Sequence, residues 1–236
     1  MEIPRELLSE FTRTLSMQPD DELPQRLCSA FAQVVGADGA AVSLGSTTST
    51  RSLLAVTDRT TEQVEDLQDM LGEGPSIRAL LGDGPSILDG QPGTAKAWPA
   101  LVTALLEHTA GRPPPALYAF PMQPQQAVLG VLTAHQTDHS GLRVDLHEAQ
   151  FLANAIGVAV LGDLDPGGAT HERWLVRDRI SQATGMVIAQ LGIPASDALA
   201  VLRAHAYANN VTLSEVSRRV VDRDLRFTSN NGEEEP

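Results

Sequence analysis

The side chains whose chemistry is most suggestive lie near the C-terminal end of the chain. Guanidinium groups pair with phosphates, while amide, hydroxyl and aromatic side chains contact the unpaired bases of RNA loops. The candidates for such contacts are Arg179, Gln182, Thr184, Arg203, His205, Tyr207, Arg218 and Arg219. An arginine on a small helical domain is more often a solvated residue, so the set indicates RNA binding more clearly than any single member.

The charge of the chain is distributed unevenly. Its formal net charge is −13. Residues 171–227 contain eight arginines and six acidic residues, which leave this segment at +2. Three glutamates follow at 233–235, so the first 170 residues hold −12. An acidic body with a weakly basic end predicts that any contact with nucleic acid is made by the C-terminal segment.

Three helices are predicted to position the candidate side chains. The first covers 171–191 and ends at Gly192, where Ile193 can make the apolar contact of a C-terminal cap. The second begins near Pro194 and ends near Ala208, since proline is favourable in a first helical turn.

The third predicted helix begins with a capping box. In Thr212-Leu213-Ser214-Glu215, the threonine and glutamate side chains can each accept a hydrogen bond from the other residue's backbone N–H. Apolar residues recur along the three helices at helical spacing and can form one shared core. They are Ile180, Val187, Leu191, Leu199, Leu202, Leu213, Val216 and Val220.

A clear break separates these helices from the rest of the chain. Residues 163–170, with the sequence DLDPGGAT, combine a proline and two glycines with polar residues, so they continue a helix poorly. The predicted organisation is an N-terminal domain over 1–162, a linker over 163–170 and a three-helix domain over 171–227. Residues 228–236, which end in EEEP, are predicted to be a disordered tail.

The first 162 residues alternate between helical and strand patterns. Apolar residues at helical spacing predict helices, and short apolar runs between turns predict strands. The predicted helices cover 1–17, 22–35, 60–70, 98–108 and 143–162. The predicted strands cover 40–44, 52–56, 116–121 and 128–134. Between them, LGEGPSI over 71–77 is nearly repeated as LGDGPSI over 81–87, and this pair is interpreted as a loop, a short helix and a loop.

The helix predicted over 143–162 has apolar residues on nearly all sides. Leu146, Ala149, Ala153, Ile156 and Val160 repeat at the three-four spacing of a coiled-coil seam. A helix that is apolar all round has to be buried on two sides. We expect one side to pack on the sheet and the other on a second subunit, which predicts a homodimer.

The sequence supports no enzymatic function. The six histidines lack metal-ligand spacing, and the glycine-rich segments lack the Gly-Lys-Ser/Thr of a P-loop. No nucleophile motif is present, so we expect neither a catalytic site nor a metal site, and the cofactor is unknown.

The single cysteine and the apolar content indicate the compartment. Cys28 cannot form an internal disulfide and occupies an apolar position of a predicted helix. The first residues carry charges throughout, and no stretch reaches the roughly 20 apolar residues of a membrane span. We therefore expect a cytoplasmic protein that does not enter a membrane, with Cys28 buried.

The C-terminal motifs resemble a known family. The segments that carry the resemblance are RISQATGMV over 179–187, Ala198-Leu199, LRAHA over 202–206 and LSEV over 213–216. In order and spacing they resemble the ANTAR domain, over roughly 171–227. The resemblance implies a small all-α, three-helix module that binds RNA in transcription antitermination. Thr184 stands where many members of this family carry lysine, which removes one positive charge.

Motifs in the first 162 residues resemble the GAF domain, which often precedes ANTAR in one chain. They are LGEGPS over 71–76, Trp98, YAFP over 118–121 and LGVL over 129–132. The resemblance implies an α+β sensor domain in which an antiparallel sheet is flanked by helices. It places a sensor-pocket loop, able to face a small-molecule ligand, at Gly72, Gly74, Ser76 and Trp98. Ser76 stands where many related sensors carry cysteine, so a thiol-based role is not expected there.

Together these features predict a signal-responsive antitermination regulator that binds RNA hairpins at terminators. A DNA-binding transcriptional regulator is an alternative, because three short helices also build a helix-turn-helix. Against it, Glu215, Asp222 and Asp224 accompany the arginines of the third helix. A further alternative is a ligand-binding dimerisation module without nucleic-acid binding, which the low charge of +2 permits.

Overall fold

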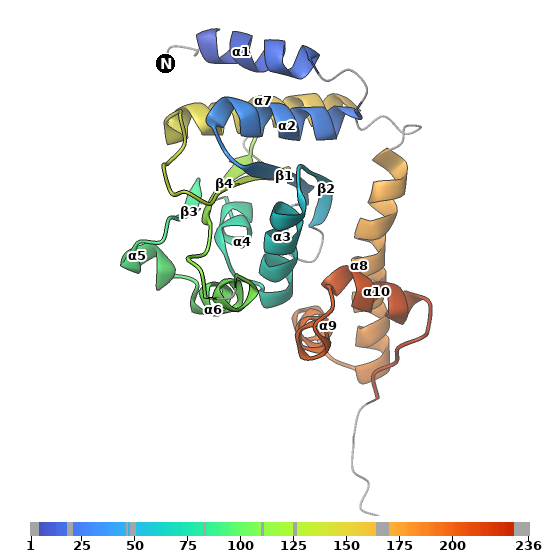
Figure 1. Cartoon of the computed structure of the whole chain (residues 1–236). Helices are drawn as coiled ribbons and strands as arrows, with labels where there is room; N and C mark the ends of the chain where they lie inside the picture. Colours follow the sequence, from blue (N-terminus) through green and yellow to red (C-terminus); the bar gives the residue numbers. More distant parts are fainter. Residues whose placement is uncertain are drawn as a thin grey trace, which may run out of the picture.

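The computed structural model describes residues 5–17, 21–45, 47, 51–82, 84–109, 111–124, 127–163 and 170–228, with side chains described except at 92 and 170–178. Figure 1 shows the arrangement of the elements. The N-terminal helices are α1 (Arg5–Ser16), α2 (Leu23–Val35), α3 (Arg59–Leu71), α4 (Pro75–Leu80), α5 (Pro92–Ala95), α6 (Pro99–His108) and α7 (Leu146–Asp163). The strands are β1 (Gly39–Leu44), β2 (Ser52–Val56), β3 (Ser86–Leu88), β4 (Ala116–Met122) and β5 (Gly130–Gln136). The C-terminal helices are α8 (Thr170–Leu191), α9 (Ala195–Asn209) and α10 (Leu213–Val221).

The five strands form one antiparallel sheet in the order β2-β1-β5-β4-β3. In its centre, Leu132 of β5 is paired with Val42 of β1 and with Phe120 of β4. All three side chains are fully buried and belong to the largest apolar cluster. Because successive residues of a strand point to opposite faces, Val131 and Ala119 lie on the other face, in a smaller cluster.

Helices cover both faces of this sheet. α2 and α7 lie on one face, with α1 packed outside α2 (Figure 1). Phe31 of α2 meets Phe120 edge to face, with ring centroids 6.0 Å apart, which is a favourable aromatic geometry. α3 and α4 lie on the opposite face, and α6 packs against α3. α3 is therefore placed between the sheet and the outer elements.

Cys28 is fully buried in α2, as the sequence predicts. Burial in apolar surroundings, with a smaller effect from Asp58, raises the pKa of its thiol far above the usual range. The thiolate is the reactive form, so we expect Cys28 to be inert towards a disulfide reagent such as DTNB in the native protein. One equivalent should react rapidly in denaturant, and fast labelling without denaturant would contradict the prediction.

Most predicted elements are confirmed to within a few residues, and the second glycine-rich segment is the exception. The first copy gives a loop and α4, whereas Ser86 and Ile87 of the second copy, together with Leu88, form β3 at the sheet edge. The interpretation of these residues as loop was wrong. A three-residue strand carries too little periodicity to be recognised, and its state is fixed by pairing with β4.

The seam residues of α7 pack within the chain. Ala149, Ala153, Ile156 and Val160 are buried in the cluster formed with α2 and the sheet. These residues therefore form the side that was predicted to pack on the sheet, and the contact of the other side with a second subunit stays a prediction. The α7 side chains that remain exposed include Leu146, Val158 and Leu161.

Two predicted segments are only partly described. Of the linker expected over 163–170, Asp163 ends α7 and Thr170 begins α8, and residues 164–169 lie outside the described residues. Residues 229–236 of the expected tail also lie outside them.

Candidate functional site

The C-terminal helices have a core of their own. Ile180 and Val187 of α8, Leu199 and Leu202 of α9, and Val216 of α10 are at most 5% exposed. Leu213 and Val220 are buried with them, while Leu191 packs at the edge of the cluster. The predicted core is thereby confirmed, and its helices present their other faces to solvent or to the N-terminal part.

Only half of the predicted capping box forms at the start of α10. The Thr212 hydroxyl oxygen accepts a hydrogen bond from the Glu215 backbone N–H at 3.1 Å. The Glu215 carboxylate instead accepts two hydrogen bonds from the Arg218 guanidinium, at 2.7 and 3.1 Å. Asp222 accepts a third, also at 3.1 Å. These contacts lower the pKa of Glu215 and raise that of Arg218. Arg218 is therefore paired within its own helix.

Two other candidate contact residues are engaged inside the helical unit. Thr184 is 6% exposed, and its hydroxyl donates a hydrogen bond to the Ile180 carbonyl oxygen at 2.7 Å. The His205 ring meets Phe227 edge to face, with centroids 5.4 Å apart. Thr184 is thus placed where nucleic acid cannot reach it.

Arg203 and Tyr207 face the N-terminal part of the chain. α9 contacts α3 (Figure 1). The Arg203 Nε–H donates a hydrogen bond to the Asp69 carbonyl oxygen at 3.0 Å. Burial lowers the pKa of Arg203, although Asp69 opposes this effect. Met70 packs against the cores of both parts. Tyr207 is 62% exposed and lines a cleft of about 510 Å³ beside this contact.

The end of α3 that receives Arg203 is held by a buried ion pair. Arg51, 2% exposed, pairs with the carboxylates of Glu65 and Asp69, and its Nε–H donates to the Ser43 hydroxyl at 3.1 Å. This group was not predicted from the sequence, because the spacing of the three charged residues does not link Arg51, which precedes β2, to a helix.

The predicted sensor-pocket loop does not border an open cavity. Ser76 is fully buried, donates to the Glu65 carboxylate at 3.0 Å and accepts from the Gln68 amide at 2.8 Å. Gly72 and Gly74 cap α3 and α4, and Trp98 precedes α6 with its side chain half buried. The space beside Ser76 amounts to about 10 Å³, too small for a ligand.

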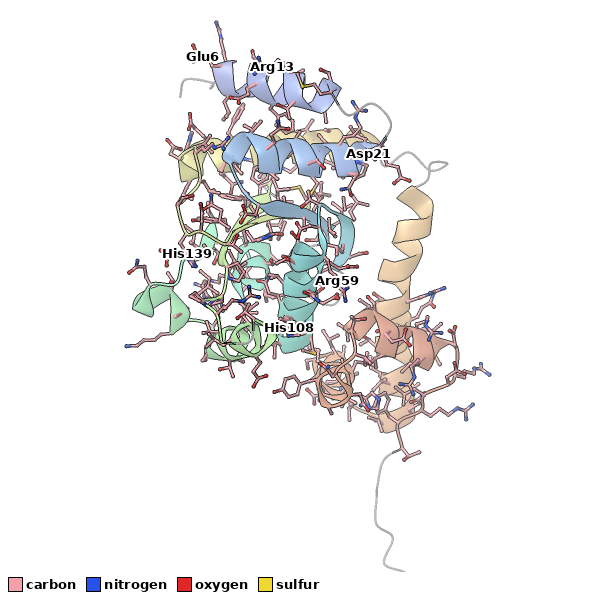
Figure 2. All side chains as sticks on the ribbon, viewed as in Figure 1. Glu6, Arg13, Asp21, Arg59, His108 and His139 are labelled. Atoms are coloured by element: carbon pink, nitrogen blue, oxygen red, sulfur yellow. The ribbon has the colours of Figure 1, made fainter. Side chains whose placement is uncertain are left out.

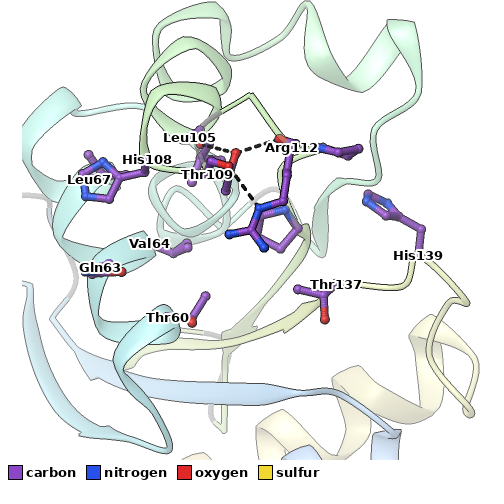
Figure 3. A pocket seen from close by; sticks show the side chains of 12 residues that line it. Thr60, Gln63, Val64, Leu67, Leu105, His108, Thr109, Arg112, Thr137 and His139 are labelled. Atoms are coloured by element: carbon purple, nitrogen blue, oxygen red, sulfur yellow. Dashed lines mark hydrogen bonds between the residues drawn. The ribbon is translucent and has the colours of Figure 1, made fainter.

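An open cleft of about 540 Å³ lies instead between α3 and α6. Figure 3 shows the Arg112 guanidinium projecting into it, with His108 and His139 on either side. Two hydrogen bonds to Thr109 hold Arg112 in place. The Arg112 Nε–H donates to the Thr109 carbonyl oxygen at 3.2 Å, and the Thr109 hydroxyl donates to the Arg112 carbonyl oxygen at 2.6 Å. This cleft could not be predicted from the sequence, because its walls come from segments far apart in the chain.

Comparison with known families identifies the C-terminal helices. Residues 169–221 match the model of the ANTAR domain. These helices form an ANTAR domain. The predicted fold class is confirmed: an α+β part with an antiparallel sheet flanked by helices precedes a small all-α domain.

The part that precedes the ANTAR domain resembles GAF domains of known structure. One comes from a phosphoenolpyruvate-protein phosphotransferase of Coxiella burnetii, at 16% identity and a TM-score of 0.46, covering 67% of this chain and 92% of that one. A GAF domain from A. aeolicus matches at 16% identity and a TM-score of 0.39, covering 68% and 95%. A phycocyanobilin-bound GAF domain of a cyanobacterial phytochrome matches at 15% and 0.38, covering 67% and 93%. Among curated proteins, no relative matches the chain.

The remaining candidate residues of the ANTAR domain are accessible. Arg179 and Gln182 on α8 are exposed, and Arg219 on α10 is half buried. The eight candidates therefore do not form one surface: some point to solvent, some to the N-terminal part, and Thr184 to the core.

The described residues contain no group of three or more His, Cys, Asp or Glu that could hold a metal ion. No single helix among the described residues is long and apolar enough to span a membrane. Among these residues, only the segments Arg179–Leu191 and Ala195–Asn209 reach that length and apolarity when taken together, and the angle between them is 105°.

Asp66 of α3, beside the ANTAR domain, makes stability depend on pH. Burial, together with the nearby charges of Asp69 and Glu62, raises its pKa to about 7, although Arg51 opposes this shift. The folded state keeps a proton that the unfolded state releases near pH 4, so the free energy of unfolding should fall as pH rises from about 4 to 7, by at most about 1.4 kcal/mol per unit. Asp66→Asn should flatten this decline in urea titrations across that range. An equally steep decline in the variant would contradict the prediction.

Proposed function

We propose that the chain is a signal-responsive antitermination regulator that binds structured RNA hairpins at terminators through its ANTAR domain. The observation that carries the proposal is the ANTAR match over 169–221, on a three-helix unit with its own core. The α+β part supplies the sensor. Neither part carries a catalytic motif, so we expect regulation rather than catalysis.

The contact between α3 and α9 suggests how the sensor restrains the output. Arg203 points at Asp69 rather than at solvent, so this cation is withheld from RNA in the arrangement seen here. A second cleft of about 510 Å³, lined by Met70, Asn210 and Thr212, also flanks the contact. The Arg203 Nη2 is buried without a hydrogen-bond partner among the described residues. A buried donor left unpaired costs about 1–3 kcal/mol, so the docked state is suited to release.

The first contact with RNA would be made by the accessible side chains. Arg179 and Gln182 on α8 and Arg219 on α10 can meet phosphates and unpaired bases while Arg203 is docked. Release would make Arg203 available for a further contact. Thr184 is buried and makes no such contact.

The assembly and the compartment stay predictions. A cytoplasmic homodimer would allow two ANTAR domains to engage a paired hairpin element. Val158, at 59% exposed, and Leu161, at 41%, are among the α7 side chains available for such a contact.

A binding experiment tests the proposal. Fluorescence anisotropy of the full chain would compare hairpin RNA with duplex DNA of the same sequence, over a range of salt concentrations. We expect a preference for RNA and weaker binding with a reduced salt slope in Arg179→Ala/Arg219→Ala. Preference for the duplex would instead favour a DNA-binding regulator, and dimerisation without any nucleic-acid binding would favour a dimerisation module.

A further inference from the structure

We propose that the cleft between α3 and α6 is the signal site of the sensor domain, and that it binds a small organic carboxylate with a compact apolar body. This inference rests on the proposed function, because it assigns a ligand to the part proposed as sensor. Four features of the described residues carry it: the filled interior beside the sheet, the charge of the cleft, the placement of its polar groups and its apolar walls.

The interior between α3 and the sheet is already occupied by protein. Gln68 donates to Glu65 and Ser76 and accepts from the Ser76 backbone N–H, at 2.8–3.1 Å. Glu65 is also paired with Arg51. A ligand entering here would have to break several buried hydrogen bonds and separate an ion pair, each at a high cost in free energy. The sensor site therefore lies elsewhere.

The open cleft is cationic in an acidic protein. Its lining contains Arg112, His108 and His139 but no aspartate or glutamate, although the chain carries 30 acidic residues. No carboxylate among the described residues forms an ion pair with Arg112. A guanidinium group projecting into a cleft without an acidic partner is suited to receive the anion of a ligand.

Two backbone features fix the positions of these polar groups. Thr109 holds the backbone and Nε of Arg112, so its terminal nitrogens point into the cleft (Figure 3). His139 has a φ of 55°, in the left-handed region that few residues other than glycine adopt. Asp89 and Asp138 interact electrostatically with His139, but neither lines the cleft. Asp89 accepts a hydrogen bond from the Thr94 hydroxyl, and Asp138 accepts one from the Ser140 backbone N–H.

The remaining walls suit an apolar body of limited size. Val64 and Leu67 of α3 face Leu105 of α6, and Pro113 and Pro115 close one side. A volume of about 540 Å³ lies within the usual range of small-molecule sites. The planar fork of one arginine matches a carboxylate in two parallel hydrogen bonds, and one permanent cation balances one negative charge. A monocarboxylate therefore fits better than a multiply charged phosphate.

The test uses the full chain and pairs of ligands that differ only in charge. Calorimetry would measure the binding of benzoate and hexanoate against benzamide and hexanamide, with acetate as a carboxylate that lacks the apolar body. We expect benzoate or hexanoate to bind at least tenfold more tightly than its amide and than acetate. Arg112→Ala and Arg112→Gln should each abolish this preference. Arg13→Ala removes the same charge from the exposed face of α1, far from the cleft (Figure 2), and should change nothing.

Three results would overturn the inference. They are equal affinity for carboxylates and amides, no detectable binding of either larger carboxylate, and unchanged carboxylate binding in both Arg112 variants with native circular dichroism. RNA binding is measured separately, so the two proposals can fail independently. If the chain binds carboxylates through Arg112 but does not bind hairpin RNA, this inference is supported and the proposed RNA-binding function is refuted. If it binds hairpin RNA but not carboxylates, the proposed function is supported and this inference is refuted.

Discussion

Replacement of Arg51 by alanine is expected to lower the free energy of unfolding by about 3–5 kcal/mol, because a buried ion pair loses one partner. The Glu65 side chain is only 2% exposed, so without Arg51 it would be a buried carboxylate without its cationic partner, or it would have to take up a proton. Either outcome costs free energy. Asp69 would lose its contact at the end of α3. Urea unfolding followed by circular dichroism at pH 7 measures the loss.

Two variants separate the ion pair from the general effect of losing an arginine. Arg59→Ala removes an exposed arginine from α3 itself (Figure 2) and should cost less than about 0.5 kcal/mol. Arg51→Met/Glu65→Gln removes both charges while keeping most of the volume, and it should recover much of the stability lost in Arg51→Ala. A loss below 1 kcal/mol in Arg51→Ala would mean that the pair does not hold α3 in place.

Gly72→Ala is expected to raise the affinity of the full chain for hairpin RNA by about tenfold. A Cβ at this position would lie 2.9 Å from Nη1 and 3.1 Å from Cζ of Arg203. The guanidinium is the far end of a flexible side chain, so it can move aside, and this shift should weaken the hydrogen bond that its Nε–H donates to the Asp69 carbonyl oxygen. Hydrogen bonds to charged groups contribute about 1.5–3 kcal/mol, and a loss of about 1.4 kcal/mol would lower the population of the docked arrangement tenfold relative to the released one.

A second glycine gives the matched control. Gly72 and Gly84 both have positive φ, at 66° and 93°, so alanine is strained at either position. Only Gly72 has Arg203 nearby, since a Cβ at Gly84 would meet nothing within 4 Å. Gly84→Ala should lose stability without any gain in RNA affinity. Equal RNA affinity in Gly72→Ala and the unmodified chain, or equal gains in both variants, would rule out restraint through Arg203.

The sequence predicted the elements that carry strong periodicity. The core of the ANTAR domain follows from apolar residues at helical spacing, and Ile180, Leu202 and Val216 are buried as expected. The end of α8 at Gly192 follows from the same kind of local rule, with a φ of 66°. Such features depend on neighbours within a few residues, which is why the chain alone reveals them.

Features that depend on distant contacts were not predictable in this way. The apolar seam of α7 was predicted correctly from its periodicity. Periodicity does not show which neighbour covers each face of a helix, and the structure places Ala153 and Ile156 against other elements of the same chain. The sequence likewise shows an arginine at 203 without showing Asp69, from which it is 134 residues distant. Arg112 and His139 meet across the cleft only because β4 and β5 are paired.

Three parts of α3 make separate contacts, and this has a thermodynamic consequence. Val64 lies on the side that borders the cleft, Gln68 lies on the side that fills the interior, and Asp69 meets α9 near the end of the helix. If a ligand in the cleft loosens the hold on Arg203, linkage requires that bound RNA increase the affinity for that ligand by the same factor. In the proposed regulator, abundant target transcript would therefore sensitise the sensor, and the effective signal threshold would vary with the concentration of the RNA that it controls.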